Sequence, residues 1–164
     1  MKLHLALLAF AALSTPALAQ TRGLSPEQIG QIFCFASLGD DMAPAQALLT
    51  PKLTAAIATA ETRNAVIQAR APDEKPPLGD GLPWRSFPDH ADGCRVGTVT
   101  THAAEAGVEI RYSFTDYPDA NYTDTLLLVP VETETGLPPA WRIEDIVLAN
   151  DQSFVGTLTS IFAD

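Results

Sequence analysis

The stretch between Pro72 and Gly93 contains six residues that we single out as candidates for ligand binding, metal binding or proton transfer. They are Asp80, Trp84, Arg85, Asp89, His90 and Asp92. Five prolines and three glycines punctuate this stretch, and that density excludes a regular helix or strand. Loops of this length inside a compact domain are uncommon and often functional. The alternative, which we favour, is a long crossover whose Trp84 and Phe87 dip into the core.

Metal chemistry has weak support in this loop. Asp89-His90-Ala91-Asp92 resembles a ligand cluster at first sight, but the two histidines His90 and His102 lack the spacing of a zinc site. A calcium site made of Asp80, Asp89 and Asp92 would lack the dense alternating acids of a calcium loop. Motifs for a nucleophilic serine or a phosphate-binding loop are absent from the sequence. We therefore predict no metal and no cofactor.

The N-terminus has the three parts of a secretory signal peptide. Lys2 precedes an apolar run from Leu5 to Leu13, and Ala17-Leu18-Ala19 provides a small-residue cleavage signature. Cleavage after Ala19 leaves 145 of the 164 residues, which suits a single domain over residues 20–164. The apolar run is too short for a permanent transmembrane helix. We expect an exported protein, periplasmic or secreted, without membrane insertion.

The chain is acidic. Its formal net charge of −10 becomes −11 after cleavage, because the removed segment contains Lys2 and no acid. Binding to nucleic acid or to an anionic membrane surface is not expected, since both require clustered positive charge. A basic or neutral partner is easier to reconcile with this composition, although excess acid also keeps an exported protein dissolved.

Both cysteines, Cys34 and Cys94, follow the predicted cleavage site. An even number of cysteines in an oxidising compartment favours one disulfide, and two buried free thiols are the alternative. A disulfide between them would close a loop of 60 residues. In the entropic model such a disulfide raises the free energy of the unfolded chain by about 4 kcal/mol.

Three helices are predicted before the loop. Ser25-Pro26 with Gln28 is a capping-box start for a helix to about Leu38, with Gly39 as its C-terminal cap. Its apolar stripe comprises Ile29, Ile32, Phe33 and Ala36, with Cys34 at the edge. Asp40 or Asp41 can cap a short second helix through Leu49. Thr50-Pro51 starts a third, alanine-rich helix to about Arg70.

After Cys94 the apolar period becomes two, which indicates strands. Residues 94–101, 108–115 and 122–131 are predicted strands, with turns at residues 105–107 and 116–121. The run Leu126-Leu127-Leu128-Val129 suggests burial on both faces. A turn over residues 135–139 precedes the last strand, and a short helix that begins near Ser153 ends the chain.

The last strand, Trp141-Arg142-Ile143-Glu144-Asp145-Ile146, shifts phase after Ile143. Ile146 and Leu148 return to the apolar face only if a bulge lies near Glu144 or Asp145. The whole order predicts an α+β domain: N-terminal helices packed on a curved antiparallel sheet of about four strands, then a short C-terminal helix.

This sequence resembles the nuclear-transport-factor-2-like superfamily, in particular its small exported bacterial members without an assigned role. The resemblance covers roughly Ser25 to Phe162 and depends on the helix at 51–60, the Leu78–Trp84 approach to the sheet and the Trp141–Ile146 strand with its following helix. It implies a cone-like fold with a concave sheet and no particular activity. A more distant likeness is to periplasmic phospholipid-carrier proteins.

Enzymes of that superfamily, such as the ketosteroid isomerase type, place a carboxylate and a tyrosine or protonated acid in an apolar cavity. In this chain the resemblance implies Asp145, Tyr112 and Tyr122 as the corresponding candidates, but no sequence motif identifies them as catalytic. A carboxylate beside a bulge is more often solvated or bonded to nearby backbone. We lean against an enzyme.

Two hypotheses remain. The first, which we narrowly prefer, is a non-enzymatic binding module whose acidic surface or proline-rich loop meets another protein, as an inhibitor, immunity or envelope-assembly factor. The second is a carrier of a small apolar ligand, or an isomerase- or hydrolase-like enzyme, that uses the concave cavity of the sheet. The candidate ligand- or partner-binding residues are Asp80, Trp84, Arg85, Asp89, His90, Arg111 and Tyr112.

Overall fold

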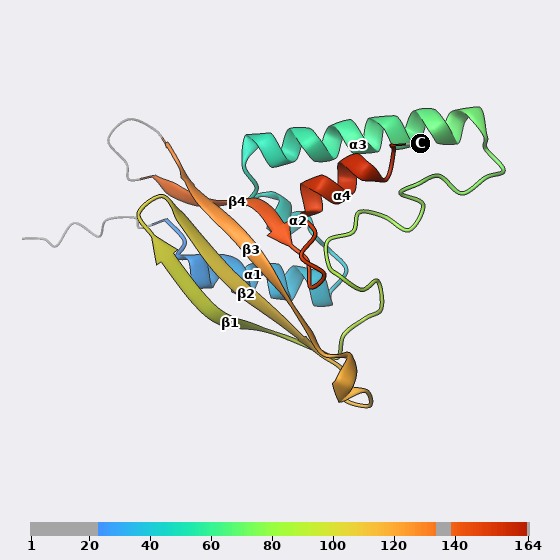
Figure 1. Cartoon of the computed structure of the whole chain (residues 1–164). Helices are drawn as coiled ribbons and strands as arrows, with labels where there is room; N and C mark the ends of the chain where they lie inside the picture. The colour runs from blue at the N-terminus through green and yellow to red at the C-terminus, as the bar shows by residue number, and fades with distance from the viewer. Residues whose placement is uncertain (1–22, 134–138, 164) are drawn as a thin grey trace, which may run out of the picture.

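The computed structural model describes residues 23–133 and 139–163 (Figure 1). In chain order the elements are α1 (Pro26–Leu38), α2 (Ala43–Gln46), α3 (Pro51–Arg70), β1 (Gly93–His102), β2 (Glu105–Ser113), η1 (Pro118–Ala120), β3 (Tyr122–Val131), β4 (Ala140–Val147) and α4 (Phe154–Ser160). The four strands form an antiparallel sheet in the order β1-β2-β3-β4. The predicted α+β class is confirmed. The predicted signal peptide and most of the 135–139 turn lie outside the described residues.

Local sequence signals start α1, α3 and α4 as predicted. The predicted cap and end of α2 were wrong, because its N-cap is Met42 without a side-chain cap and it ends at Gln46 rather than at Leu49. The Ser25 hydroxyl accepts a hydrogen bond from Gln28 N, and Ser25 N donates to Gln28 Oε1 at 2.9 Å, which completes the capping box of α1. Thr50 Oγ1 accepts from Leu53 N at 3.1 Å and caps α3. The Ser153 hydroxyl does the same for α4, with Gly156 N as its donor. Each cap satisfies a backbone N–H that the helix leaves free.

The core lies between α1 and one face of the sheet. On the strands the inner face carries Ala106, Val108, Ile110, Leu126, Leu128, Ile143 and Ile146. From α1, Ile29 and Phe33 pack into the same cluster with no exposed surface. Gly30 lies so close to the sheet that a Cβ would stand 2.7 Å from Val108 Cγ1. Helix and sheet are therefore in direct contact, and side chains fill the space between them.

β4 contains the predicted bulge. Leu127 pairs with Asp145 and the next residue of β3, Leu128, pairs with Ile143, so Glu144 is the extra residue. The outer edge of β4 is covered, because Ile143 N donates to Leu48 O and Thr50 N donates to Ile143 O, each at 2.9 Å. Covering a sheet edge in this way removes a template for unwanted strand pairing.

Cys34 and Cys94 form a disulfide that joins α1 to the start of β1, with their Cα atoms 5.4 Å apart. This was the favoured of the two cysteine predictions. No helix among residues 23–133 and 139–163 is both long enough and apolar enough to cross a membrane.

Two predictions about the strands were wrong. The first hairpin turns at residues 103–104 rather than at 105–107, because His102 pairs with Glu105 and leaves a two-residue connection. The Leu126–Val129 run is not buried on both faces: the Leu127 side chain is 40% exposed because it points to the uncovered side of the sheet.

Candidate functional site

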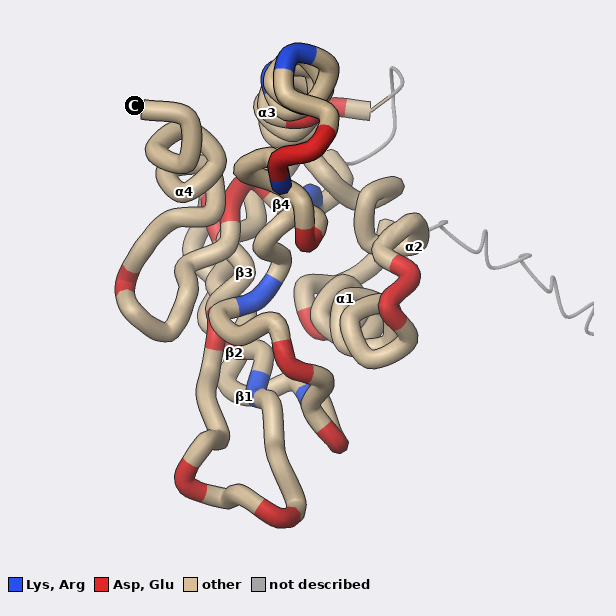
Figure 2. The backbone as a smooth tube through the Cα atoms, turned by 90° about the vertical axis from the view of Figure 1, so that its right-hand side faces the viewer, with Lys and Arg blue, Asp and Glu red and all other residues tan. Residues whose placement is uncertain are grey.

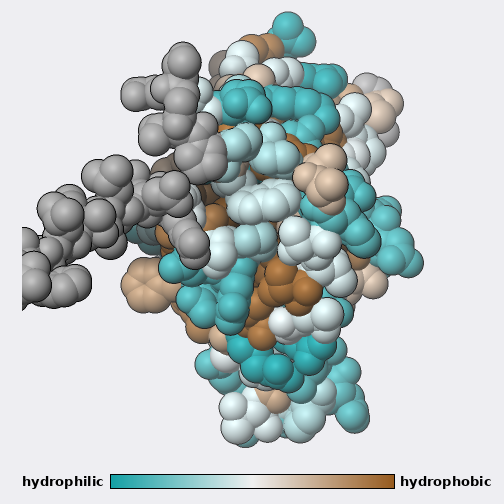
Figure 3. Space-filling view, turned by 90° about the vertical axis from the view of Figure 1, so that its left-hand side faces the viewer, coloured by the Kyte–Doolittle hydropathy of each residue, from teal (hydrophilic) through white to brown (hydrophobic). Residues whose placement is uncertain are grey.

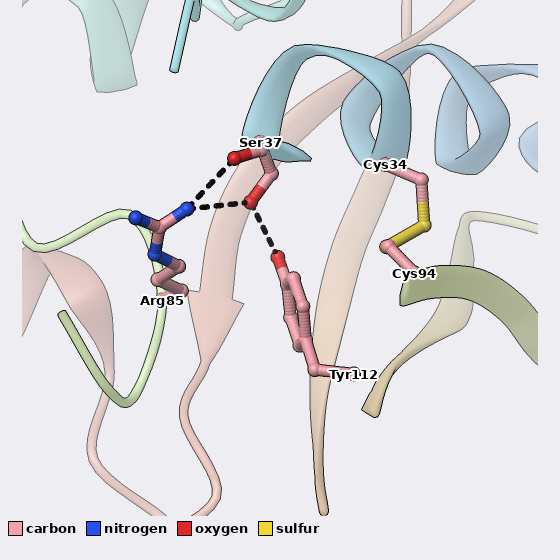
Figure 4. The surroundings of a disulfide bond; sticks show 5 residues. All are labelled: Cys34, Ser37, Arg85, Cys94 and Tyr112. Atoms are coloured by element: carbon pink, nitrogen blue, oxygen red, sulfur yellow. Dashed lines mark hydrogen bonds between the residues drawn. A yellow bond between two sulfur atoms is a disulfide. The ribbon is translucent and has the colours of Figure 1, made fainter. Parts of the chain in front are cut away.

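A buried polar cluster lies where the 71–92 loop meets the end of α1 and the sheet (Figure 4). Arg85 of the loop donates from Nη1 to Ser37 O at 2.7 Å. From Nη2 it donates to Pro88 O at 3.1 Å and to Asp40 Oδ1 at 3.2 Å. Asp40 has a left-handed backbone conformation, with φ of 52°, which turns the chain after α1. The guanidinium therefore fixes the loop to the C-terminal end of α1.

Tyr112 of β2 extends the cluster into the core. Its hydroxyl and the Ser37 hydroxyl share a hydrogen bond of 3.0 Å, and its ring stacks on Tyr122 of β3 at 4.7 Å between centroids. Burial raises the pKa of Tyr112 to about 12, and the Ser37 hydrogen bond opposes this shift. Tyr112 is accordingly a neutral phenol at physiological pH.

The Tyr122 hydroxyl is buried and has no hydrogen-bond partner in good geometry. Burial raises its pKa well above the ordinary value of 10, and the nearby Phe87 backbone amide lowers it only slightly. A buried hydroxyl without a partner costs free energy, so the stacking of Tyr122 on Tyr112 and its contact with the Phe87 ring must offset that cost.

Asp124 is the buried carboxylate of this region, with 1% of its surface exposed. Its oxygens accept hydrogen bonds from Ser86 Oγ at 2.5 Å, Ser86 N at 3.1 Å and Ala149 N at 3.0 Å. Burial raises the pKa of Asp124, and the hydrogen bonds from Ser86 and Ala149 oppose the shift. Both oxygens are held by the chain itself, so Asp124 ties the loop and the segment after β4 to β3.

Acid–base chemistry in this cluster would need a route for substrate to these groups. Asp124 and Tyr112 have raised pKa values, a property shared by catalytic acids. However, each has its hydrogen bonds satisfied within the chain, and neither has more than 2% of its surface exposed. This arrangement is typical of a structural network that holds a long loop in place.

Apart from His90, which contacts Asp40 as Arg85 does, the remaining loop candidates are dispersed rather than gathered into a site. Asp80 forms an exposed ion pair with Lys75 at 2.5 Å. Trp84 stacks on Phe154 of α4 with ring centroids 5.0 Å apart, as the predicted crossover requires. Phe87 does not dip into the core as predicted, since it is 50% exposed. His90 Nε2 lies 3.1 Å from Asp40 Oδ2, and Asp89 is exposed. Within the part of the chain that the structure describes, no three His, Cys, Asp or Glu side chains gather closely enough to hold a metal ion.

Arg111 and Tyr112 do not face one ligand. Successive strand residues point to opposite faces, so Tyr112 enters the core whereas Arg111 lies on the outer face of the sheet. There Arg111 donates to Glu109 Oε2 from Nε at 3.0 Å and from Nη2 at 2.5 Å. Asp145, named from the resemblance, accepts hydrogen bonds from the Ser153 hydroxyl and Val155 N and so positions α4.

A second candidate site is an apolar groove between α1 and α2, which the sequence analysis did not identify. It is open to solvent, has a volume of about 550 Å³ and is lined by Leu24, Gln28, Gln31, Ile32, Phe35, Pro44 and Leu48. Phe35 has 77% of its surface exposed, and Leu24 and Leu38 are also exposed. We call this surface the α1–α2 groove. Figure 3 shows hydrophobic surface between hydrophilic residues on the face that carries the start of α1.

Sequence signals for the overlooked residues were present in part. Asp124 stands in the inner row of β3 with Tyr122, Leu126 and Leu128, so strict alternation places a carboxylate on a buried face. Ile32, predicted as core, is half-buried and lines the α1–α2 groove beside Phe35. Because α1 is apolar on more than one side, its sequence alone does not say which side faces solvent.

Comparisons of this chain with protein-family models, with curated proteins and with solved structures found no match. The functional argument therefore depends on the geometry described above.

Proposed function

We propose that this protein is a non-enzymatic binding module that contacts another protein through the α1–α2 groove. The observation that carries the proposal is Phe35, a large aromatic side chain with 77% of its surface exposed beside a groove of about 550 Å³. Exposed apolar surface rimmed by polar residues is a common mark of a protein–protein interface, and aromatic side chains supply much of the binding energy there.

The polar cluster supports this choice over catalysis. Asp124, Tyr112 and Arg85 direct their hydrogen bonds to the chain itself, and thereby anchor the 71–92 loop. That role needs no substrate. Burial is the main cause of the raised pKa values of Asp124 and Tyr112, and the nearby Asp124 also raises the pKa of Tyr112.

The alternative is a carrier of a small apolar ligand, or an isomerase- or hydrolase-like enzyme, that uses the concave side of the sheet. One observation favours it: the buried Tyr122 hydroxyl has no hydrogen-bond partner. Against it, Ile29, Phe33, Leu53, Val108 and Ile110 fill the space under the sheet with no exposed surface. Native mass spectrometry of the purified protein tests this alternative, since a carrier would retain a small molecule.

We further propose that the protein is exported to the periplasm or secreted as a single domain over residues 20–164. Its leader-like N-terminus and the Cys34–Cys94 disulfide support export, because disulfides persist in oxidising compartments. The order of helices, antiparallel sheet and terminal helix supports membership of the nuclear-transport-factor-2-like superfamily as a proposal.

The experiment is affinity capture from the envelope and medium of the source organism with the wild type, Phe35→Glu and Val66→Glu. Val66 is the matched control, since it is also exposed and apolar but lies on α3. We expect a stoichiometric partner that the wild type and V66E retain and F35E loses, and that binds again when both purified proteins are mixed. Absence of a stoichiometric partner, or equal retention by F35E, would count against the proposal. Circular dichroism checks that all three proteins are folded.

A further inference from the structure

We infer that the α1–α2 groove receives an amphipathic helical segment of another protein, apolar on one side and basic at its flanks. This inference rests on the proposed function and specifies the chemistry of the partner. Its two supports are the spacing of the residues that line the groove and the charge of the elements that form it.

The spacing of the residues that line the groove suits a helical partner. Its lining residues on α1 are Gln28, Gln31, Ile32 and Phe35, which recur at intervals of three and four and so form one stripe along the helix. Pro44 of α2 and Leu48, which follows α2, also line the groove. A helix of 13 residues extends about 20 Å at 1.5 Å per residue, so α1 can accompany a partner helix of similar length. Apolar helix-in-groove recognition uses anchors with this spacing.

The charged residues on the elements that form the groove are all acidic. Residues 23–50, which include α1, α2 and the turn that joins them, contain Glu27, Asp40 and Asp41 but no Lys, Arg or His. Figure 2 shows acidic residues and no basic residues on these elements. Asp40 is already paired with Arg85 and His90. Glu27 and Asp41 form no ion pair with any residue that the structure describes, so both are available to a basic partner.

The nearest following cation does not alter this sign. Lys52, at the start of α3, is paired with Glu144 of the β4 bulge. The pair is neutral as a whole and stabilises the contact between α3 and β4. A lysine or arginine of the partner thus meets uncompensated carboxylates at both ends of the stripe, which favours association and discriminates against acidic partners.

A second copy of this chain fits the groove less well than a basic segment does. Two such faces in contact would bring Glu27 and Asp41 of both copies together, and each copy carries a formal net charge of −10. Like charges across an interface oppose association. The occupant is accordingly a different protein whose charge complements the groove.

The test uses a synthetic helical peptide of about 14 residues, with leucines at intervals of three and four and lysines on the flanks. A matched peptide has glutamates in place of the lysines. Fluorescence anisotropy measures both affinities at low and at physiological salt. We expect the lysine peptide to bind about tenfold or more tightly than the glutamate peptide, and the ratio to shrink as salt rises.

Variants assign the effect to the groove. We expect Phe35→Glu to weaken binding of the lysine peptide by about tenfold or more, and the control Val66→Glu to leave it unchanged. The double change Glu27→Gln and Asp41→Asn should reduce the preference for lysine while both peptides still bind. In the wild type, Ala43 N donates a hydrogen bond to Asp41 Oδ1 at 3.1 Å. The change Asp41→Asn keeps a side-chain oxygen that can accept this hydrogen bond.

Other results would overturn the inference. Equal, Phe35-dependent binding of both peptides would contradict it and leave the proposed function intact. Failure of the lysine peptide to bind, while Phe35-dependent capture of a partner persists, would do the same. Dimerisation that Phe35→Glu abolishes would make the occupant a second copy. Binding that occurs only in a chain trimmed to Gly23 would assign the groove to this chain's own N-terminal residues. Peptide binding that is indifferent to Phe35, together with capture indifferent to Phe35, would remove both proposals.

Discussion

Phe33 and Phe35 lie two residues apart on α1 and face opposite environments: Phe33 has no exposed surface, whereas Phe35 is 77% exposed. A separation of two residues turns a helix by about 200°, which places the two rings on opposite sides. Phe33 contributes to the core against the sheet, and Phe35 stands beside the α1–α2 groove. One short helix therefore serves both the fold and the proposed interface.

This relationship predicts two different effects of the same substitution. Phe33→Ala should lower the free energy of unfolding by about 3–5 kcal/mol, because it leaves a cavity in the core. Phe35→Ala should change it by less than about 0.5 kcal/mol. Urea denaturation followed by tryptophan fluorescence measures both. A large loss of stability in Phe35→Ala would mean that Phe35 packs against the protein itself rather than awaiting a partner.

The Cys34–Cys94 disulfide predicts a response to reductant. It joins two residues that are 60 positions apart in the chain. In the entropic model a disulfide that closes such a loop stabilises the folded state by about 4 kcal/mol. Replacing both cysteines by alanine should lower the free energy of unfolding by about 2–5 kcal/mol. The wild type should lose a similar amount when dithiothreitol is added, and the double variant should not respond. A wild type indifferent to dithiothreitol after complete reduction, verified by thiol titration, would contradict this expectation.

Much of the fold could be predicted from local signals. Ser25-Pro26 and Thr50-Pro51 start helices through their own side chains, and the shift of phase after Ile143 requires the bulge at Glu144. These features depend on a few neighbouring residues. Local chemistry is therefore sufficient to find them.

The candidate site depends instead on contacts between distant segments. The role of Asp124 requires Ser86 from the loop and Ala149 from the segment after β4, which lie 38 and 25 residues away in the chain. The exposure of Phe35 depends on which side of α1 the sheet occupies. Arg111 and Tyr112 are neighbours in sequence, yet the pleat separates them.

Asp124 predicts a specific pH dependence. Burial raises the pKa of this carboxyl group above 3.8, so the native state holds the proton more tightly than the unfolded chain does. The contribution of Asp124 to the free energy of unfolding is thus most favourable below about pH 3.8, the ordinary pKa of the group. This contribution is lost as the pH rises through the pKa of Asp124 in the native state. Asparagine does not titrate, so the stability of the wild type relative to Asp124→Asn should decrease as the pH rises from about 4 to about 7.

Urea denaturation at a series of pH values measures this difference. Asp119→Asn, which removes an exposed carboxylate from η1, is the control for the change in net charge. A stability difference between the wild type and Asp124→Asn that increases with pH would mean that hydrogen bonds from Ser86 and Ala149 outweigh burial, and that the pKa of Asp124 is lowered instead.

The two stacked tyrosines predict a contrast between two hydroxyl groups. The Tyr112 hydroxyl shares a buried hydrogen bond of 3.0 Å with Ser37, whereas the Tyr122 hydroxyl has no partner in good geometry. Tyr112→Phe should cost about 0.5–1.5 kcal/mol of stability, and Tyr122→Phe should be neutral or stabilising, because it removes a buried polar group without a hydrogen bond.

Ser37→Ala alone removes two contacts of the Ser37 hydroxyl, the hydrogen bond to Tyr112 and a weak contact at 3.5 Å with Arg85. A double-mutant cycle of Ser37→Ala with Tyr112→Phe therefore isolates the hydrogen bond to Tyr112. The coupling energy between Ser37→Ala and Tyr112→Phe should be about 1 kcal/mol, and that between Ser37→Ala and Tyr122→Phe should be close to zero. If Tyr122→Phe instead costs more than Tyr112→Phe, the Tyr122 hydroxyl has a buried partner such as an ordered water or a bound ligand. That result would revive the alternative in which the inner side of the sheet accommodates a small molecule.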